Sequence, residues 1–352
     1  MNTIRVGLIG VTGYTGMELT RLLVSHPAMR LVMACSRTEA GKKLGEHYPF
    51  LANQAGAEII ISQPDAKAAA ALCDLVFLAV PHKAAMEMAA ALLAAGVKVV
   101  DLSADFRIRD ASVYEAWYGV AHTQKNLLSQ AVYGLPELYA EQTAQAHLVA
   151  NPGCYPSSII LALHAAFAHD LILAEDIIVD AKSGTTGAGR KAAVTSLYCE
   201  VADSFRAYNI GGKHRHTPEI EQELSLMAGK PVVVSFNPHL LPINRGILST
   251  IYTKLKNTET TLGAVHDAYC RTWQGSQWVR VLPLGSLPET RNVRGTMFCD
   301  IGLALDERTG RLIVVSAIDN LCRGASGQAI ANANLLCGLP VSTGLLLAPL
   351  MP

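Results

Sequence analysis

The hydrophobic pattern divides this chain into two parts with different organisation. In the first part, short apolar runs alternate with longer segments whose apolar residues recur with helical spacing. Because the apolar runs are unbroken, helices should cover both faces of the sheet they form. This alternation predicts a parallel, doubly wound sheet of the Rossmann type. The strands are predicted at residues 4–10, 31–35, 75–80 and 97–102, and the clearest helices at 15–25, 66–72 and 83–95.

After residue 156 the predicted strands become longer and the helices fewer, which predicts an α+β domain on a mixed or antiparallel sheet. These strands are predicted at residues 177–181, 232–236, 247–255, 279–282, 297–305 and 311–317. Residues 319–336 show helical spacing again, and we expect the segment 319–352 to return to the first domain. The predicted domains are therefore 1–152, joined by that segment, and 153–318.

Composition narrows the class of protein. Of 352 residues, 50% are hydrophobic and 16% are charged, which is typical of a folded globular chain. Lys plus Arg and Asp plus Glu number 29 each, so no basic surface for nucleic acid is indicated. The first residues enter a strand without a signal-peptide pattern, and the apolar stretch 84–100 is interrupted by Glu87 and Lys98. We expect a soluble protein that does not enter a membrane.

The eight cysteines are spread over the chain at positions 35, 73, 154, 199, 270, 299, 322 and 337, with no Cys-x-x-Cys pair. Such spacing argues against a zinc site and against a disulfide framework. It suits a reducing compartment, so we expect a cytoplasmic protein without a bound metal.

A glycine-rich turn follows the first predicted strand and opens the first predicted helix. Gly10, Gly13 and Gly16 are spaced Gly-x-x-Gly-x-x-Gly, a variant of the dinucleotide fingerprint. Glycine lets the backbone approach a pyrophosphate, whose charge the helix N-terminus stabilises. The alternative is an ordinary tight turn. The predicted cofactor-binding residues of this turn also include Thr12, Tyr14 and Thr15.

The end of the second predicted strand indicates which dinucleotide binds. An NAD site usually places an acidic residue there for the ribose 2′-hydroxyl. This chain has Ser36 and Arg37 instead, and a hydroxyl with a guanidinium suits a 2′-phosphate. We therefore expect NADP(H); the less favoured alternative is that Arg37 is a solvated loop charge.

Candidate chemistry centres on Cys154. It stands between a Pro152–Gly153 turn and Pro156, ahead of an apolar run, which places the thiol near the N-terminus of a buried helix. That position favours the thiolate, and the downstream His214 and His216 offer a proton donor or acceptor. We expect His216 to be the acid/base with Glu219 as an orienter or substrate contact; His214 is the alternative. A buried structural cysteine is the competing interpretation.

With these residues, the sequence resembles the N-acetyl-gamma-glutamyl-phosphate reductase family, which is related to aspartate-semialdehyde dehydrogenase. The resemblance is collinear over nearly the whole chain. Two departures, Ser157 for threonine and Thr186 for serine, keep a hydroxyl. The matching motifs are Gly10–Gly16, Leu102–Arg107, Tyr133–Glu137, Pro152–Pro156, Ser183–Arg190, His214–Glu219 and Asp319–Leu321.

The resemblance implies NADPH-dependent reduction of N-acetyl-glutamyl 5-phosphate to the 5-semialdehyde through a thioester on Cys154, in arginine biosynthesis. It also implies a homodimer or homotetramer. For the anionic substrate it implies Arg107, beside Ser103, as the leading phosphate contact, with Lys182, Arg206, Lys213 and Arg245 as weaker candidates. For the nicotinamide half of the cofactor it implies Ser183, Gly184, Gly187 and Asn320.

Two other functions remain open at this stage. A reductase of the longer aminoadipyl phosphate, used in lysine synthesis, would need the same thiol, histidine and cofactor. A non-catalytic NADP-binding sensor would need neither the helix-start cysteine nor the histidine pair, so both motifs count against it.

Overall fold

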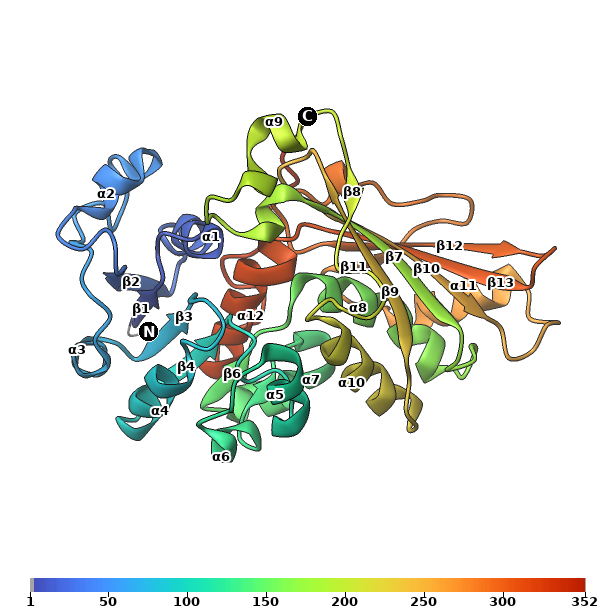
Figure 1. The fold of residues 1–352 in the computed structure, drawn as a ribbon, viewed down its shortest axis with the longest axis horizontal. Coiled ribbons are helices and arrows are strands. Elements are labelled where there is room, and N and C mark those ends of the chain that lie inside the picture. The colour runs from blue at the N-terminus through green and yellow to red at the C-terminus, as the bar shows by residue number, and fades with distance from the viewer. Residues whose placement is uncertain (1–2, 352) are drawn as a thin grey trace. The chain divides into compact units, whose positions relative to one another are not determined.

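The computed structural model describes residues 3–351, and its residues group into two compact units (Figure 1). The first unit runs to Pro152 and includes Ala325–Leu346. The second contains Gly153–Gly324 and the segment that begins at Leu347. The chain therefore passes between the units at 152–153, at 324–325 and again at 346–347. Across the described residues 3–351, no helix is long and apolar enough to span a membrane.

The first unit contains a parallel sheet of six strands in the order β2-β1-β3-β4-β6-β5. Most residues of its inner strands are buried, as the unbroken apolar runs predicted. The strands are β1 (Ile4–Ile9), β2 (Met29–Cys35), β3 (Leu75–Leu78), β4 (Lys98–Asp101), β5 (Val132–Tyr133) and β6 (Leu148–Ala150). The predicted Rossmann-type class is thus confirmed.

Eight helices of the first unit are described, and the last comes from the returning segment and packs against α7, α1 and β4. They are α1 (Tyr14–Leu23), α2 (Leu44–His47), α3 (Ala66–Leu72), α4 (Met86–Ala94), α5 (Ala111–Tyr118), α6 (Lys125–Leu128), α7 (Pro136–Gln145) and α12 (Gly327–Leu336). The single helix predicted over 319–336 is wrong in its first turns. Asp319 accepts the backbone N–H groups of Leu321 and Cys322, which favours a turn there, and a π-helical turn at Cys322–Ser326 precedes α12.

A buried amide on α12 fastens the segment that follows this helix. Asn334 donates to the carbonyl oxygens of Val341 and Thr343 at 3.0 and 2.9 Å. His26 Nε2 lies 3.2 Å from Asn334 Oδ1, while His26 Nδ1 accepts the backbone N–H of Met29 at 2.9 Å. Burial lowers the pKa of His26, which keeps the ring neutral in this role.

The second unit contains a mixed sheet of seven strands in the order β11-β12-β13-β10-β7-β9-β8. The pairs β7–β9 and β11–β12 are parallel and the others antiparallel, so the predicted mixed sheet is confirmed. The strands are β7 (Ile177–Gly184), β8 (Arg206–Ala207), β9 (Val234–Leu241), β10 (Ile247–Lys254), β11 (Val279–Val281), β12 (Cys299–Asp306) and β13 (Arg311–Ile318).

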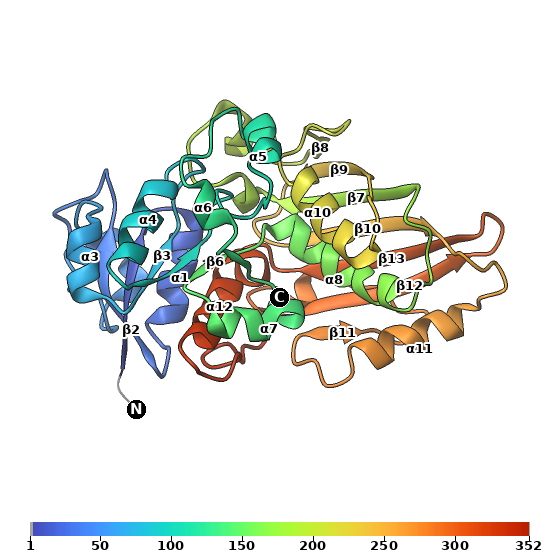
Figure 2. The same cartoon turned by 90° about the horizontal axis from the view of Figure 1, so that it is seen from below.

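One face of this sheet is covered by the helices α8 (Cys154–Ala168), α10 (Thr217–Ala228) and α11 (Leu262–Thr272), as Figure 2 shows. Burial alternates along β7, β9 and β10, with every second residue fully buried. Ser158 of α8, Ser249 of β10 and Ser316 of β13 form a buried hydroxyl cluster beneath the helices. The helix that begins at Cys154 is thus held on a rigid sheet.

Candidate active site

Cys154 is the first residue of α8, as the Pro-Gly turn predicted, and Gly153 is its N-cap. The thiol is partly exposed and lies where the helix dipole stabilises negative charge. Gly324 packs directly against it: a Cβ atom at position 324 would lie 2.6 Å from the Cβ of Cys154. Only glycine fits there, so the backbone at 324 forms a wall beside the Cys154 side chain.

The carboxylate of Glu219 holds the backbone of Gly153, the residue that precedes Cys154. This carboxylate, fully buried in the first turn of α10, accepts the N–H of Gly153 through Oε1 at 2.7 Å. A charged acceptor makes this a strong bond and satisfies one of the N–H groups that a helix start leaves unpaired. This bond fixes Gly153, and both predicted roles of Glu219, as an orienter of the acid/base and as a substrate contact, stay predictions.

His216 lies against the residue that precedes Cys154. It is the N-cap of α10, and a Cβ atom at Gly153 would be 2.6 Å from its Nε2. The ring also packs edge-on against Tyr155, with 6.1 Å between ring centroids. Its Nε2 therefore lies next to the residue that precedes Cys154, and its role as the acid/base stays a prediction.

His214 occupies a different environment. Its ring lies between Tyr155, Tyr208 and Phe236, with centroid separations of 5.6, 5.5 and 5.2 Å. Its Nδ1 accepts the backbone N–H of His216 at 3.1 Å. Burial lowers the pKa of His214 to about 4, so the imidazole is neutral near pH 7. These contacts describe a residue that holds His216 in place.

A glycine-rich segment ends β7 and meets the β9–β10 connection. The hydroxyl of Ser183 is buried and donates to the carbonyl oxygen of Gly184 at 3.0 Å. A Cβ at Gly184 would lie 2.8 Å from the carbonyl oxygen of Asn244, so the two backbones need glycine to approach. Gly187 is exposed. The segment thus presents backbone and two exposed glycines, Gly187 and Gly189, next to well-fixed strands.

Asn320 ties this segment to its neighbours. Its Oδ1 accepts the N–H of Gly246 at 2.8 Å, and its Nδ2 donates to Thr186 Oγ1 at 2.9 Å. The neighbouring Asp319 accepts the N–H of Gly295 at 2.7 Å and lies 3.4 Å from the Nε of Arg245. The Asp319–Asn320 pair therefore fastens several connections of the second unit. The predicted contact of Asn320 with the cofactor stays a prediction.

The first unit carries the glycine-rich turn predicted for a dinucleotide. Gly10 has φ +95°, and a Cβ there would lie 2.2 Å from the carbonyl oxygen of Ala79. At Gly16 a Cβ would meet the carbonyl oxygen of Gly10 at 2.3 Å. At Gly13, the N-cap of α1, the nearest atom would be 3.8 Å away. Two glycines are thus required by the fold, and the third leaves open space at a helix N-terminus, which suits a pyrophosphate.

The end of β2 lies next to this glycine-rich turn. The hydroxyl of Ser36 is buried 3.3 Å from the hydroxyls of Thr12 and Thr38. The side chain of Arg37 is exposed, and its carbonyl oxygen accepts a bond from Gln63. An exposed guanidinium beside a hydroxyl cluster at this strand end fits a ribose 2′-phosphate.

The residues predicted to hold the anionic substrate lie in unlike settings. Arg107 is buried and donates from Nε to the carbonyl oxygen of Asn151 at 2.7 Å and from Nη2 to that of Leu102 at 2.8 Å. Ser103 is buried, and its hydroxyl donates to Asp101 at 2.7 Å. Both side chains therefore shape the loop after β4, and their contact with substrate stays a prediction.

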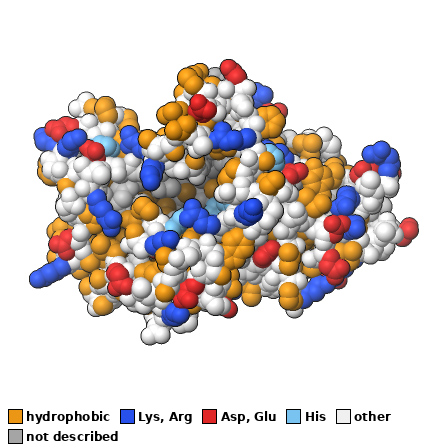
Figure 3. Space-filling view, viewed as in Figure 1, with side chains coloured by type: hydrophobic (Ala, Val, Ile, Leu, Met, Phe, Trp, Pro, Cys, Tyr) orange, Lys and Arg blue, Asp and Glu red, His pale blue; other side chains and the backbone are white. Residues whose placement is uncertain are grey.

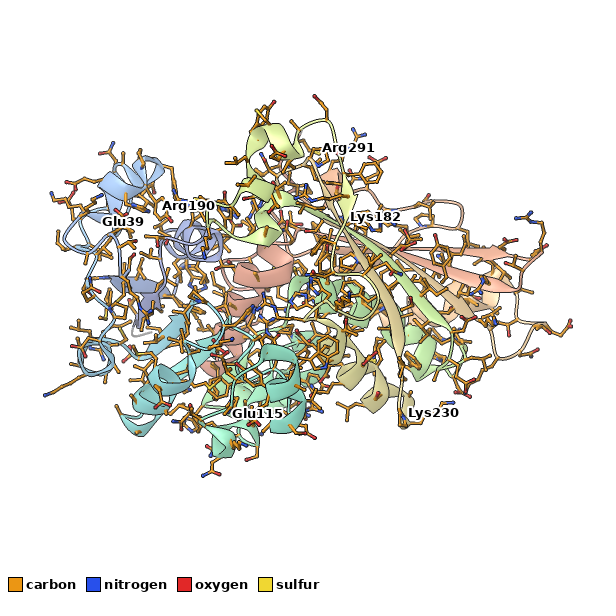
Figure 4. All side chains as sticks on the ribbon, in the orientation of Figure 1. Glu39, Glu115, Lys182, Arg190, Lys230 and Arg291 are labelled. Atoms are coloured by element: carbon orange, nitrogen blue, oxygen red, sulfur yellow. The ribbon has the colours of Figure 1, made fainter. Side chains whose placement is uncertain are left out.

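The other cations predicted to contact the substrate include Lys182, Arg206 and Lys213, and their contacts with substrate also stay predictions. Lys182 (Figure 4) is half-buried on the sheet face opposite Ser183 and the helix layer, and its Nζ donates to the carbonyl oxygen of Asp180 at 3.0 Å. It therefore points away from the face that carries Cys154. Arg206 donates to the carbonyl oxygens of Thr195 and Glu200, and Lys213 is exposed.

Comparison with known proteins shows which protein family the chain belongs to. A family model described as semialdehyde dehydrogenase, NAD binding domain, matches residues 5–146, and one described as semialdehyde dehydrogenase, dimerisation domain, matches residues 154–320. Aspartate semialdehyde dehydrogenase II of Vibrio cholerae, solved with ASA, aligns with a TM-score of 0.72 at 15% identity, over 96% of this chain and 99% of that one. Fold and site together define an oxidoreductase of the semialdehyde dehydrogenase family.

Two full-length relatives narrow this further. A protein of Desulfotalea psychrophila (strain LSv54 / DSM 12343) named N-acetyl-gamma-glutamyl-phosphate reductase is 52% identical over 349 residues, 99% of this chain and 100% of its own. A protein of the same name from Geobacter sp. (strain M21) is 50% identical over 351 residues, with the same coverage. The chain belongs to the N-acetyl-gamma-glutamyl-phosphate reductase family.

Proposed function

We propose that this protein reduces N-acetyl-glutamyl 5-phosphate to N-acetylglutamate 5-semialdehyde, with release of phosphate, in arginine biosynthesis. The observation that carries the proposal is Cys154 at the start of α8, between the wall at Gly324 and the carboxylate-bound Gly153. The full-length relatives bearing the name of this activity supply the substrate.

In the proposed reaction, the Cys154 thiolate attacks the acyl carbon, a C–S bond forms, and the bond to the phosphate oxygen breaks. Residues Gly10–Gly16, Ser36 and Arg37 would hold NADPH, which when bound would supply a hydride to reduce the resulting thioester. His216 stabilises the negative oxygen that then develops on the former carbonyl by a hydrogen bond, and any proton that it transfers to this oxygen returns to His216 as the carbonyl re-forms. Breakage of the C–S bond releases the aldehyde and returns the thiolate. His214 holds His216 through its backbone N–H, and Glu219 holds Gly153.

The direct test is an assay at 340 nm in the reverse direction, with N-acetylglutamate 5-semialdehyde, phosphate and NADP. We expect NADPH formation that depends on phosphate, because phosphate must release the acyl group from the thioester. The homologous aminoadipate semialdehyde serves as the comparison. Activity only with the longer aldehyde would move the protein to lysine synthesis, and turnover with neither would support a sensor.

We further propose NADP(H) as the cofactor, held by the turn Gly10–Gly16, by Ser36 and by Arg37. Replacing Arg37 by alanine is expected to weaken NADP binding by roughly 10-fold or more, since it removes a charge-assisted contact of about 1.5–3 kcal/mol. NAD binding should change little because NAD lacks the 2′-phosphate. Titration of both nucleotides by fluorescence measures this, and an unchanged NADP/NAD ratio would refute the assignment.

Family membership indicates an oligomer, and we propose a homodimer or a pair of such dimers. The supporting feature is the sheet face of the second unit that carries Ile178, Thr250, Tyr252 and Ile313, opposite the helix layer. A second apolar surface surrounds α9 (Tyr198–Val201), where Val194, Tyr198 and Phe205 are 70, 84 and 69% exposed (Figure 3). Sedimentation at the monomer mass would contradict the proposal. Cytoplasmic localisation is also proposed, since the spread of the eight cysteines along the chain suits a reducing compartment.

A further inference from the structure

Asn151 is a buried residue that the proposed reaction does not use, and every polar group it has is bonded. Its backbone N–H donates to the carbonyl oxygen of Asp101 at 2.8 Å, and its carbonyl accepts the Nε of Arg107 at 2.7 Å. Its Oδ1 accepts Nδ2 of Asn332 at 3.0 Å, and its Nδ2 donates to the carbonyl oxygen of Ala325 at 3.1 Å. The side chain is fully buried, so an unmatched replacement is costly.

These bonds join two places where the chain passes between the units. Asn151 lies just before the connection 152–153, and Ala325 lies just after the connection 324–325. Its amide therefore holds the two connections together within the first unit, and Asn332 of α12 keeps the amide in one orientation. Asn332 is itself fixed, because its Nδ2 also donates to the carbonyl oxygen of Gly134 at 2.8 Å.

The same two connections meet again in the second unit, at the nucleophile. Within three residues of Asn151 the chain reaches Cys154, and the residue before Ala325 is Gly324, which packs on Cys154 without room for a Cβ. A shift of one connection relative to the other would change the contact between the thiol and this wall. Displacements of about 1 Å at a reacting atom can cost roughly 100-fold in rate.

We propose that Asn151 is a positioning residue for Cys154, acting through the paired connections 152–153 and 324–325. The proposal rests on the proposed thioester function only for its kinetic readout. An amide is required because one end must accept from Asn332 and the other must donate to Ala325. Aspartate has the same shape but replaces the donor by an oxygen that faces the carbonyl of Ala325.

The test compares Asn151→Asp and Asn151→Ala with a matched control at Asn334. Asn334 is equally buried, lies on α12 close to Asn332, and donates to two backbone carbonyls that are remote in sequence from both connections. Asn334→Asp should therefore lower Tm as much as the Asn151 variants without altering the thiol. Asn151→Ala separates loss of the amide from the added charge of aspartate.

The first readout is the rate of iodoacetamide alkylation of Cys154 against pH, which needs no substrate. In both Asn151 variants we expect the rate at pH 7 to fall about 10-fold and the midpoint of the pH profile to rise, because a displaced thiol loses helix-dipole stabilisation. In the assay, kcat should fall roughly 10- to 100-fold with KM within about threefold. Asn334→Asp should match the wild type in both readouts.

Several results would overturn the proposal. One is an unchanged alkylation profile in folded Asn151→Ala, and another is an effect limited to Asn151→Asp, which would be a charge effect. Equal losses in the Asn334 control would show a general loss of stability. Should Asn151→Ala fail to fold, Asn332→Ala removes the bond to Asn151 Oδ1 together with the bond to the carbonyl oxygen of Gly134, and it is expected to shift the alkylation profile in the same direction. A wild-type profile would count against the proposal. If the semialdehyde assay fails in the wild type but the alkylation pattern holds, the function is wrong and the positioning role stands.

Discussion

Replacing Cys154 by alanine is expected to abolish turnover in both directions, with a loss of about 10⁴- to 10⁶-fold, because no other group can carry the acyl intermediate. The side chain is partly exposed, and the substitution removes a single sulfur atom. The variant should therefore fold and bind NADP like the wild type. The loss is measured by NADPH formation at 340 nm, alongside nucleotide titration and Tm.

Cys270 provides the matched control for this substitution. It is an exposed free thiol on α11, and Cys270→Ala should retain wild-type turnover. Serine at position 154 should be nearly as inactive as alanine, because a hydroxyl in place of the thiol lacks a usable anion near pH 7. Substantial activity in Cys154→Ala would show that the reaction does not pass through a thioester on Cys154.

Replacing His216 by asparagine is expected to lower kcat by about 10²- to 10⁴-fold, the usual contribution of a positioned acid/base. The substitution removes Nε2, the atom that lies against Gly153. Alkylation of Cys154 in this variant shows whether the loss lies in proton transfer or in the thiol itself.

The same substitution at position 214 discriminates between the two histidines. The Oδ1 of asparagine can replace Nδ1 as acceptor for the N–H of His216, so His214→Asn should cost less than roughly tenfold. Since the pKa of His214 is about 4, its neutral ring does not titrate between pH 5 and 9, and the variant should keep the wild-type profile in that range. A larger loss at 214 than at 216 would exchange the two roles.

Much of the fold is predictable because its cause is local. The unbroken apolar runs of the first unit correspond to strands buried on both faces, and the Gly10–Gly16 turn corresponds to β1 followed by α1. The start of α8 at Cys154 follows from its Pro-Gly turn and apolar run. The short strands β5 and β6 escaped prediction, since two or three apolar residues give no measurable period.

The candidate site is predictable only in its residue types. Cys154, His216 and Glu219 stand out in the sequence, but the bond from Gly153 to Glu219 joins residues that are 66 positions apart. The contact of Gly324 with Cys154 and the bond from Asn151 to Ala325 span still longer separations. No periodicity encodes such pairs, because they depend on how α8, α10 and the returning segment pack. The bonds of Ser103 to Asp101 and of Arg206 to the carbonyl oxygen of Thr195 are closer in sequence, but a polar side chain has several partners within reach, and the sequence does not show which one it uses.

Mass spectrometry of the enzyme shows directly whether Cys154 carries the acyl group during the reaction. The enzyme is mixed with N-acetyl-glutamyl 5-phosphate without NADPH, quenched in acid and digested. We expect the peptide that contains Cys154 to gain the mass of one N-acetylglutamyl group. The corresponding peptide of Cys154→Ala should gain no mass. If the enzyme reduces the substrate but never shows this adduct, Cys154 does not carry the acyl group. An adduct on another cysteine would lead to the same conclusion.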